Sequence, residues 1–375
     1  MIRQFLQKIL TNPVIRLADK FSSRPDRTII FQALSDLLEN IYAKKGDKGL
    51  VIEQDIQKDK FIILSDLHKG AKNGADDFMD CESTYISALT YYDALQFHYI
   101  CLGDSEELWE NNLSAVKAAN KLSVEKEKLF IQRNAFTKVF GNHDLFWDQD
   151  PFAGIQLKTI YGAAVKIYEG VILKTIIAGK QLDILLTHGH QGDKQSDGNW
   201  FSKFFVSRIW GPLQSFLRIN PNTPAYNTQL KSLHNSLMYE WSSQQKNLVL
   251  ITGHTHQPVF ESLTLLENLV KRWDLAKTMN DEVGIKSYEA EIKTRQIELP
   301  VAPNLYDKAL STYFNSGCCC FSDGDITGIE IEGGYIRLVR WKTNSELCTR
   351  SVLEEKKLDA LLLPGEQESG SLAHQ

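Results

Sequence analysis

Residues 61–68 read FIILSDLH, an apolar run of strand length that is closed by Asp66 and His68. Such a run, rich in β-branched and aromatic residues, favours a buried strand. The same arrangement returns four times, each time with Asp, Asn, His or Gly after the apolar residues. These segments are HYICLGD (98–104), KVFGNHD (138–144), LDILLTHGH (182–190) and NLVLITGHTH (247–256). The sequence therefore predicts five strands that end in polar clusters.

The first three clusters are evenly spaced. The interval from Asp66 to Asp104 is 38 residues (104 − 66), and so is the interval from Asp104 to Asn142 (142 − 104). Residues 85–95 and 114–133, between the clusters, have helical character, which suits strand–helix–strand units. In open α/β sheets, ligands bind beyond the carboxyl ends of the strands. We therefore expect an α/β fold in which the polar clusters converge on one site.

The converging side chains form a mixed set of imidazole, carboxylate and amide donors, which suits Mn, Fe, Zn or Ni better than copper or magnesium. One ion needs only about four to six ligands, so the surplus predicts two divalent ions that share a bridging carboxylate. Asp104, directly after Gly103, is a short anionic side chain that fits the bridge. The set consists of Asp66, His68, Asp104, Asn142, His143, His188, His190, His254 and His256.

Any one of these clusters alone would be an ordinary polar strand end. A single Asp-x-His or Gly-His pair usually stabilises a turn and has no further role. Five clusters in order, each after an apolar run, are hard to explain as loop chemistry. We therefore interpret the whole set as a metal centre.

Composition excludes several other classes of protein. Of the 375 residues, 43% are hydrophobic and 24% are charged, as in ordinary globular chains. The net charge of −5 argues against a general nucleic-acid binder, so no nucleic-acid partner is expected. No apolar run approaches the roughly 18 residues of a membrane-spanning helix. The N-terminal residues lack the continuous apolar region of a secretory signal, and we expect a cytoplasmic protein.

The six cysteines form no recognisable disulfide or zinc framework. Cys318, Cys319 and Cys320 are consecutive within an apolar stretch and are interpreted as small core residues of a strand. Reduced thiols are the simplest reading for a cytosolic chain.

The remaining segments suggest a single core with additions. Residues 1–58 are expected to form an N-terminal helical extension, and 59–345 the main domain. An amphipathic helix within 1–21 either packs on the domain or makes a peripheral contact with the inner face of the membrane. The main domain contains an aromatic helical insertion at 196–247 and a charged helical insertion at 262–300. Residues 346–375 are expected to be a C-terminal tail.

The five clusters resemble the signature blocks of the calcineurin-like metallophosphoesterases. The resemblance is carried by Asp66-Leu67-His68, Gly103-Asp104, Gly141-Asn142-His143-Asp144, His188-Gly189 and Gly253-His254-Thr255-His256, within residues 60 to 341. It implies a four-layer α/β/β/α sandwich with helical insertions and a binuclear metal centre at the strand ends. One ion would take Asp66, His68, Asp104 and His256, and the other would take Asp104, Asn142, His188 and His254.

The resemblance also implies a metal-dependent phosphoric ester hydrolase. A metal-bridging hydroxide would attack phosphorus, and the two ions, most simply Mn²⁺ with Fe, Zn or Ni as alternatives, would neutralise the phosphoryl oxygens. His143 would stabilise or protonate the leaving group. Asp144 would either orient the His143 ring or cap the turn in which it lies.

The substrate is less sharply indicated. The segment Gly103–Trp109, of the form GDxxExW, is similar to the UDP-2,3-diacylglucosamine pyrophosphatase branch of the family. Glu107, Trp109 and His190 are therefore candidate substrate-binding residues, and the insertion at 196–247 is a candidate cap. The expected substrate is a phosphorylated small molecule or a lipid-linked diphosphate, with a phosphoprotein or a cyclic nucleotide as alternatives. A non-catalytic scaffold, like the retromer subunit of this fold, is the remaining alternative, although the degenerate members lack ligands that are present here.

Overall fold

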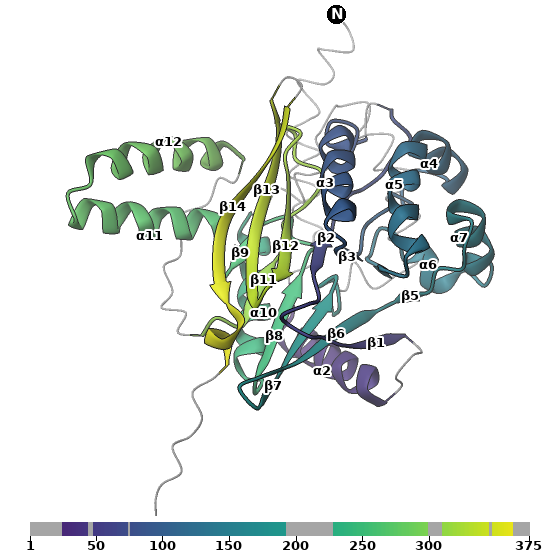
Figure 1. Ribbon diagram of the computed structural model, residues 1–375, viewed down its shortest axis with the longest axis horizontal. Coiled ribbons are helices and arrows are strands. Elements are labelled where there is room, and N and C mark those ends of the chain that lie inside the picture. Colours follow the sequence, from purple (N-terminus) through teal and green to yellow (C-terminus); the bar gives the residue numbers. More distant parts are fainter. Residues whose placement is uncertain are drawn as a thin grey trace, which may run out of the picture.

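The computed structural model describes residues 25–43, 48–73, 76–192, 228–298, 310–344 and 347–362. Within these ranges, two seven-stranded β-sheets lie face to face, with helices on their outer sides (Figure 1). We call them sheet A and sheet B. The aromatic segment 193–227, the first 24 residues and the last residues lie outside the described ranges, so the expectations for the cap, the N-terminal helix and the end of the chain are not addressed.

Sheet B carries the first three polar clusters. Its strand order is β14-β13-β12-β2-β3-β4-β5. Strands β2 to β5 are mutually parallel, as expected from the strand–helix–strand spacing, and β12, β13 and β14 run antiparallel to their neighbours. The strands are β2 (Phe61–Leu64), β3 (His98–Leu102), β4 (Phe136–Val139), β5 (Ile167–Tyr168), β12 (Ile326–Glu332), β13 (Tyr335–Asn344) and β14 (Leu347–Lys357).

Sheet A carries the last two clusters. Its strand order is β1-β6-β7-β8-β11-β9-β10, and the central pairs β7–β8 and β8–β11 are parallel. The strands are β1 (Gly49–Glu53), β6 (Gly170–Ile177), β7 (Lys180–Thr187), β8 (Leu248–Thr252), β9 (Val259–Phe260), β10 (Leu263–Thr264) and β11 (Tyr313–Asn315).

Strand β2 shows how one short apolar run serves two cores. Its residues alternate between the two faces of the sheet, and all four are buried. Phe61 and Ile63 join the cluster between the two sheets, whereas Ile62 and Leu64 join the cluster beneath the helices. Each fully buried side chain of this size stabilises the fold by about 1.5–3 kcal/mol. A run that is apolar on both faces is therefore what the middle of a layered sandwich requires.

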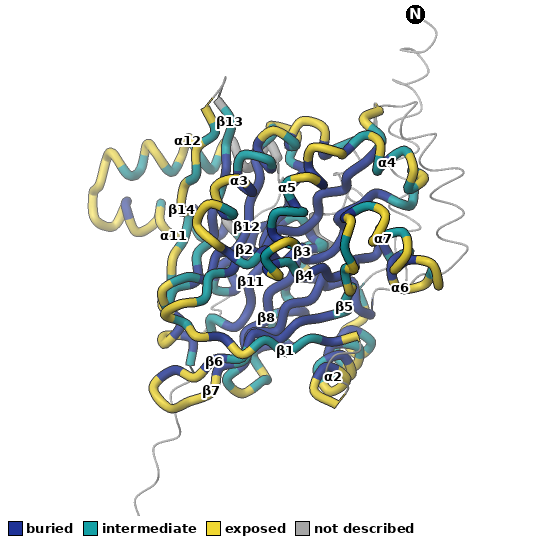
Figure 2. Tube along the Cα trace, turned by 45° about the vertical axis from the view of Figure 1, so that its right-hand side comes forward, coloured by how far each residue is buried: buried dark blue, intermediate teal, exposed yellow. Residues whose placement is uncertain are grey.

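Helices complete the outer layers (Figures 1 and 2). On sheet B, α3 buries Tyr85, Leu89 and Tyr92 against the strands, and α5 adds Phe130. On sheet A, α2 and α10 share a core that contains Trp241. The four-layer α/β/β/α arrangement expected from the resemblance is confirmed. The helices are α2 (Arg27–Ala43), α3 (Glu82–Ala94), α4 (Leu113–Ala119), α5 (Lys121–Gln132), α6 (Phe146–Gln149), α7 (Ala153–Tyr161), α10 (Thr228–Ser243), α11 (Leu265–Thr278), α12 (Glu282–Glu298) and the 3₁₀ helix η3 (Leu358–Leu361).

Segment boundaries differ from the sequence expectation at both ends. Within the expected N-terminal extension 1–58, α2 packs on sheet A and β1 pairs in parallel with β6, so both belong to the core. The expected tail from residue 346 is not a tail over its first part, because β14 pairs with β13 along its length. Residues 262–300 hold the hairpin of α11 and α12, which projects from the sheets in Figure 1. A capping box between Thr264 and Glu267 begins its first helix.

None of the helices in the described ranges combines the length and the apolar character needed to cross a bilayer.

Candidate metal centre

The polar clusters lie at the carboxyl ends of five strands. Strands β2, β3 and β4 of sheet B end at one edge, and β7 and β8 of sheet A end beside them. Because parallel strands present their carboxyl ends on the same side, residues far apart in the sequence become neighbours. The residues so placed are Asp66 and His68 after β2, Asp104 after β3, Asn142 and His143 after β4, His188 after β7, and His254 and His256 after β8.

Five of these residues have a left-handed backbone. Their φ angles lie between 48° and 67°, a region that non-glycine residues rarely occupy and that costs on the order of 1 kcal/mol or more each. Hydrogen bonds hold the conformation: the Asp66 N–H donates to the Gly103 carbonyl at 3.1 Å, and the His68 N–H donates to the Asp104 carbonyl at 2.9 Å. The curled chain lets Asp66 and His68, two residues apart, face the same point. The five residues are Asp66, His68, Asp104, His254 and His256.

Glycines precede the candidate ligands because other ligands press against them. A Cβ atom on Gly141 would lie 2.2 Å from Asp104 Oδ1, and one on Gly253 would lie 2.4 Å from Asp66 Oδ2. A Cβ atom on Gly103, which also has φ +85°, would lie 2.5 Å from the His188 ring. Each glycine therefore provides room for a side chain that another strand delivers.

The first donor set brings together two imidazoles and two carboxylates. His256 Nε2 lies 3.2 Å from Asp66 Oδ1 and 3.2 Å from His68 Nε2. His68 Nε2 lies 3.9 Å from Asp66 Oδ1 and 3.8 Å from Asp104 Oδ2. Donor atoms bound to one ion at about 2.1 Å lie roughly 3–4 Å from one another, so these atoms fit around a single cation.

The second donor set shares Asp104 with the first. His188 Nε2 lies 3.1 Å from Asp104 Oδ2 and 3.2 Å from the Asn142 side-chain oxygen. Asp104, His188 and His254 also offer ligand atoms that all lie within 4.8 Å of one another. The same carboxylate oxygen, Asp104 Oδ2, thus faces an imidazole of each set. The donors fit two cations bridged by Asp104, although their roles as ligands stay predictions.

Both buried carboxylates keep their charge. Burial raises the pKa of Asp104, but the neighbouring His188 and His143 outweigh it and hold the pKa well below its usual range. Burial likewise raises the pKa of Asp66, and His256 and His188 outweigh it and lower the pKa. The Asp66 carboxylate also accepts the N–H of His254 at 3.0 Å. Two fixed anions amid imidazoles form a site that is suited to cations.

His143 adjoins the first donor set: one of its ring nitrogens lies within 4.8 Å of ligand atoms of His68 and Asp104. Its backbone N–H donates to Asp104 Oδ1 at 2.8 Å, its ring stacks on Trp109 with centroids 4.4 Å apart, and its Nδ1 lies 2.6 Å from Glu107 Oε2. Burial lowers the pKa of this imidazole, but the Glu107 and Asp104 carboxylates raise it to about 10. The ring is therefore held in one orientation, and the two carboxylates favour its protonated form. That arrangement suits a group that donates a proton or stabilises a developing anion.

The partner of His143 differs from the sequence expectation. The Asp144 carboxylate accepts the Gly141 N–H at 2.6 Å and the Ser105 N–H at 2.9 Å, so it ties together the loops after β3 and β4. The expectation that Asp144 orients His143 is therefore wrong, and its alternative as a turn cap is the one observed. Glu107 orients the ring instead. Sequence reasoning missed this role because Glu107 lies 36 residues before His143, on another strand end.

The three candidate substrate-binding residues occupy different positions. Glu107 is buried, and its Oε2 also lies 3.0 Å from His68 Nδ1, so its carboxylate faces protein groups. Trp109 covers one face of the His143 ring. His190 is buried with its ring 5.4 Å from that of His188. Substrate contact stays a prediction for Trp109 and His190, and the contacts of Glu107 favour a role in orienting histidines.

A buried ion network lies beneath the site. Lys69 Nζ lies 2.8 Å from Glu127 and 3.1 Å from Glu106, and Lys138 lies 2.9 Å from Glu106. All four residues are buried. Lys69 is the residue directly after His68, and Glu106 lies two residues after Asp104. The network therefore joins the loops that carry these two candidate ligands. Buried ion pairs contribute little net stability, because desolvation offsets their attraction, and we interpret this network as fixing the loops of the site.

Two further residues near the site were missed. His234, on α10, lies with its Nε2 2.8 Å from the Gly189 carbonyl and its ring 5.2 Å from that of His254. Cys320 lies with its sulfur 3.7 Å from His256 Nδ1. Neither belongs to a strand-end motif, so the sequence carried no signal for them. The expectation that Cys318 to Cys320 belong to a strand is wrong, because all three lie in the loop after β11, although they are buried as expected.

Comparison with protein families agrees with this geometry. A model of the calcineurin-like phosphoesterase family matches residues 59–258, which is 200 of the 375 residues. No curated protein matches the chain significantly. Among solved structures, the chain is similar to vacuolar protein sorting 29 from Cryptosporidium parvum at 13% identity and a TM-score of 0.32, over 80% of this chain and 98% of that one. A likeness at this score says nothing about activity. Since the family match begins before Asp66, ends beyond His256 and so contains both donor sets, the chain belongs to the calcineurin-like phosphoesterase family.

Proposed function

We propose that the protein is a metal-dependent phosphoesterase that uses two divalent ions to hydrolyse a phosphate ester or a diphosphate bond. The observation that supports this most is the position of Asp104. Its Oδ2 faces His188 Nε2 at 3.1 Å in one donor set and His68 Nε2 at 3.8 Å in the other. A carboxylate shared in this way is what a pair of closely spaced ions requires.

Each donor set would hold one ion. Asp66, His68, Asp104 and His256 would hold one, and Asp104, Asn142, His188 and His254 the other. When bound, the two ions supply positive charge for the phosphoryl oxygens and lower the pKa of the water that attacks phosphorus. The nitrogen and oxygen donors favour Mn²⁺, with Fe, Zn or Ni as alternatives.

His143 would act on the leaving group. The Nδ1–H of its ring donates a hydrogen bond to Glu107, which leaves Nε2 to donate a hydrogen bond or a proton to the departing oxygen. Stacking on Trp109 keeps the ring plane fixed during this step.

The substrate belongs among phosphorylated small molecules or lipid-linked diphosphates. The support is the GDxxExW segment, because the candidate cap at 196–247 lies largely outside the described residues. A panel of an aryl phosphate mono- and diester, a lipid-linked nucleotide sugar, a cyclic nucleotide and a phosphopeptide, each with Mn²⁺, separates the alternatives.

The replacement Asp104→Asn tests the proposal. It keeps the shape of the side chain but removes the shared negative charge. Removing a group that only hydrogen-bonds to a metal ligand lowers metal affinity or activity by about 10–100-fold. Asp104 would contact the ions directly, so its loss should lower turnover by at least about 100-fold. Asp183→Asn is the matched control and should keep full activity, because Asp183 is a half-buried residue near the start of β7, at the far end of that strand from His188. An asparagine there can still accept the hydrogen bond from the Tyr42 hydroxyl. Unchanged turnover by Asp104→Asn, or no turnover by the unaltered protein with any metal and substrate, would contradict the proposal.

A further inference from the structure

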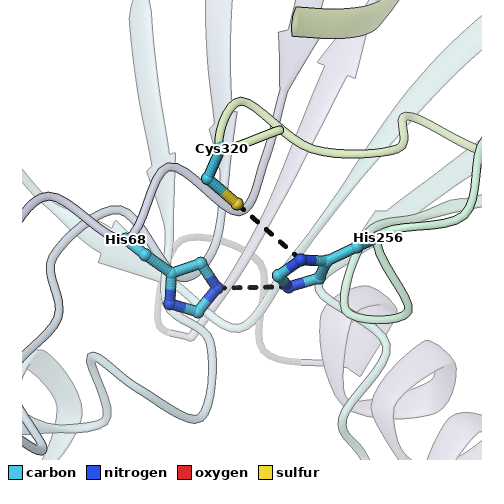
Figure 3. A group of neighbouring side chains, drawn as sticks. All are labelled: His68, His256 and Cys320. Atoms are coloured by element: carbon cyan, nitrogen blue, oxygen red, sulfur yellow. Dashed lines mark hydrogen bonds between the residues drawn. The ribbon is translucent and has the colours of Figure 1, made fainter. Parts of the chain in front are cut away.

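The thiol of Cys320 contacts a candidate metal ligand from outside the donor sets. Cys320 is fully buried in the loop between β11 and β12, and its Sγ lies 3.7 Å from His256 Nδ1. Figure 3 shows the sulfur at one nitrogen of the His256 ring and His68 at the other. This contact belongs to none of the five strand-end clusters.

Two other histidines of the site, His68 and His188, share a common arrangement. His68 directs Nε2 toward the donor atoms, and its Nδ1 lies 3.0 Å from Glu107. His188 directs Nε2 toward Asp104, and its Nδ1 lies 3.0 Å from the Leu102 carbonyl. Such outer partners fix the tautomer and the orientation of a ligating imidazole. In His256 the same position, beside Nδ1, is occupied by sulfur.

The Cys320 sulfur and one ring nitrogen each of His68 and His256 all lie within 4.8 Å of one another, so direct coordination has to be weighed against a positioning role. The directions of the two nitrogens of His256 favour positioning. His256 Nε2 lies 3.2 Å from both Asp66 Oδ1 and His68 Nε2, so it is the nitrogen that faces the donor set. The lone pairs of the two ring nitrogens point in diverging directions, so a group beside Nδ1 lies away from an ion on Nε2. A cation on Nε2 also requires the ring proton to be on Nδ1. The Nδ1–H can then donate a hydrogen bond to the sulfur.

The loop that carries the thiol is tied to the same site. The Cys319 N–H donates to the Asp66 carbonyl at 3.1 Å, and the Thr327 N–H donates to the Cys318 carbonyl at 3.1 Å. The loop is thereby held between a candidate ligand on one side and β12 on the other. The position of the sulfur is set by the backbone of the site itself.

We propose that Cys320 is a positioning residue of the metal centre. Its sulfur accepts a hydrogen bond from the Nδ1–H of His256 and thereby holds Nε2 toward Asp66 and His68. This inference rests on the proposed metal-dependent function. It predicts that the thiol controls how tightly the first donor set, and not the second, retains its ion.

Three variants test the inference. Cys320→Ala removes the acceptor and should weaken the binding of one of the two ions by about 10–100-fold. Cys320→Ser keeps an acceptor and should restore most of that loss. Cys319→Ala makes the same truncation one residue away, where the sulfur faces the Thr327 carbonyl in the helix-side core, and should bind both ions like the unaltered protein. Elemental analysis after dialysis against graded free Mn²⁺ measures ions per chain, with turnover recorded on the same samples.

Several outcomes would overturn the inference. Unchanged binding of both ions by Cys320→Ala, with only a lower melting temperature, would show a purely structural role. With Co²⁺ as a probe, a near-ultraviolet thiolate-to-cobalt band that disappears in Cys320→Ala would show direct ligation instead. An unaltered protein that binds no ion contradicts both proposals. One that binds two ions without turnover contradicts the phosphoesterase alone, and the comparison of variants still decides the role of Cys320.

Discussion

At the scale of single residues, the carboxylate of Glu107 holds two imidazoles at once. Its Oε2 lies 2.6 Å from His143 Nδ1 and 3.0 Å from His68 Nδ1. Burial raises the pKa of this carboxyl, but His143 and His68 together outweigh it and lower the pKa below its usual value, so the group stays ionised. One buried anion therefore couples a candidate metal ligand to the candidate acid of the reaction.

Glu107→Gln should lower kcat by about 10–100-fold while the protein remains folded. The amide is nearly isosteric but carries no charge, so the pKa of His143 should fall and the alkaline limb of the pH–rate profile should move to lower pH. The profile is measured with Mn²⁺ against an aryl phosphate.

Glu125→Gln, an exposed glutamate on α5, is the control and should leave both the rate and the profile unchanged. If the Glu107 variant kept the profile of the unaltered protein, His143 would not be the group that titrates.

At the scale of elements, sequence patterns predicted the inner strands better than the edges. Strand β2 is apolar on both faces because both faces are covered by other layers. Its four-residue apolar run was therefore enough to predict a buried strand. Strand β14, with the sequence LCTRSVLEEKK, lies at the edge of sheet B and is largely exposed. Charged residues protect such an edge from pairing with other chains. The same charges make it look like a tail in the sequence.

Strand β3 also begins with a half-buried histidine whose surroundings favour the neutral ring. His98, at its start, hydrogen-bonds Thr137 through Nε2 at 2.7 Å. Burial, with a contribution from Arg133, lowers its pKa from 6.5 to about 4. The unfolded chain therefore binds a proton below pH 6.5 that the folded protein does not bind until about pH 4. Stability from this residue is present above pH 6.5 and is lost as the pH falls toward 4.

His98→Gln should remove this dependence. From the two pKa values, the His98 contribution to the free energy of unfolding falls by about 2 kcal/mol between pH 7.5 and pH 5. The variant should lose less stability than the unaltered protein over this window, as measured by urea unfolding at both pH values. Parallel losses in the two proteins would assign the pH dependence to other groups.

At the scale of the whole molecule, the candidate metal centre joins the two sheets. Asp66, His68, Asp104 and Asn142 extend from sheet B, whereas His188, His254 and His256 extend from sheet A. Ions bound between them would link the two halves of the sandwich. Binding to the folded state alone stabilises it by about 2.7 kcal/mol for each ion present at 100 times its Kd.

Removal of metal should therefore lower the melting temperature by several degrees. The protein is melted with Mn²⁺ and after treatment with a chelator, and the difference should shrink in Asp104→Asn but persist in Asp183→Asn. Equal melting temperatures with and without metal would show that no ion links the sheets.

The amino-acid sequence was sufficient to predict an α/β fold and the residues that converge at the strand ends, because strand-end motifs are local and their order along the chain follows the topology. The sandwich itself was expected from the resemblance of these motifs to a known family. The side chains that contact those residues could not be predicted in the same way. Glu107 beside His143, Cys320 beside His256, and the side chains that press against Gly103 and Gly141 come from different strands. Such contacts depend on the twist and spacing of two packed sheets, which bring together groups that no local pattern connects.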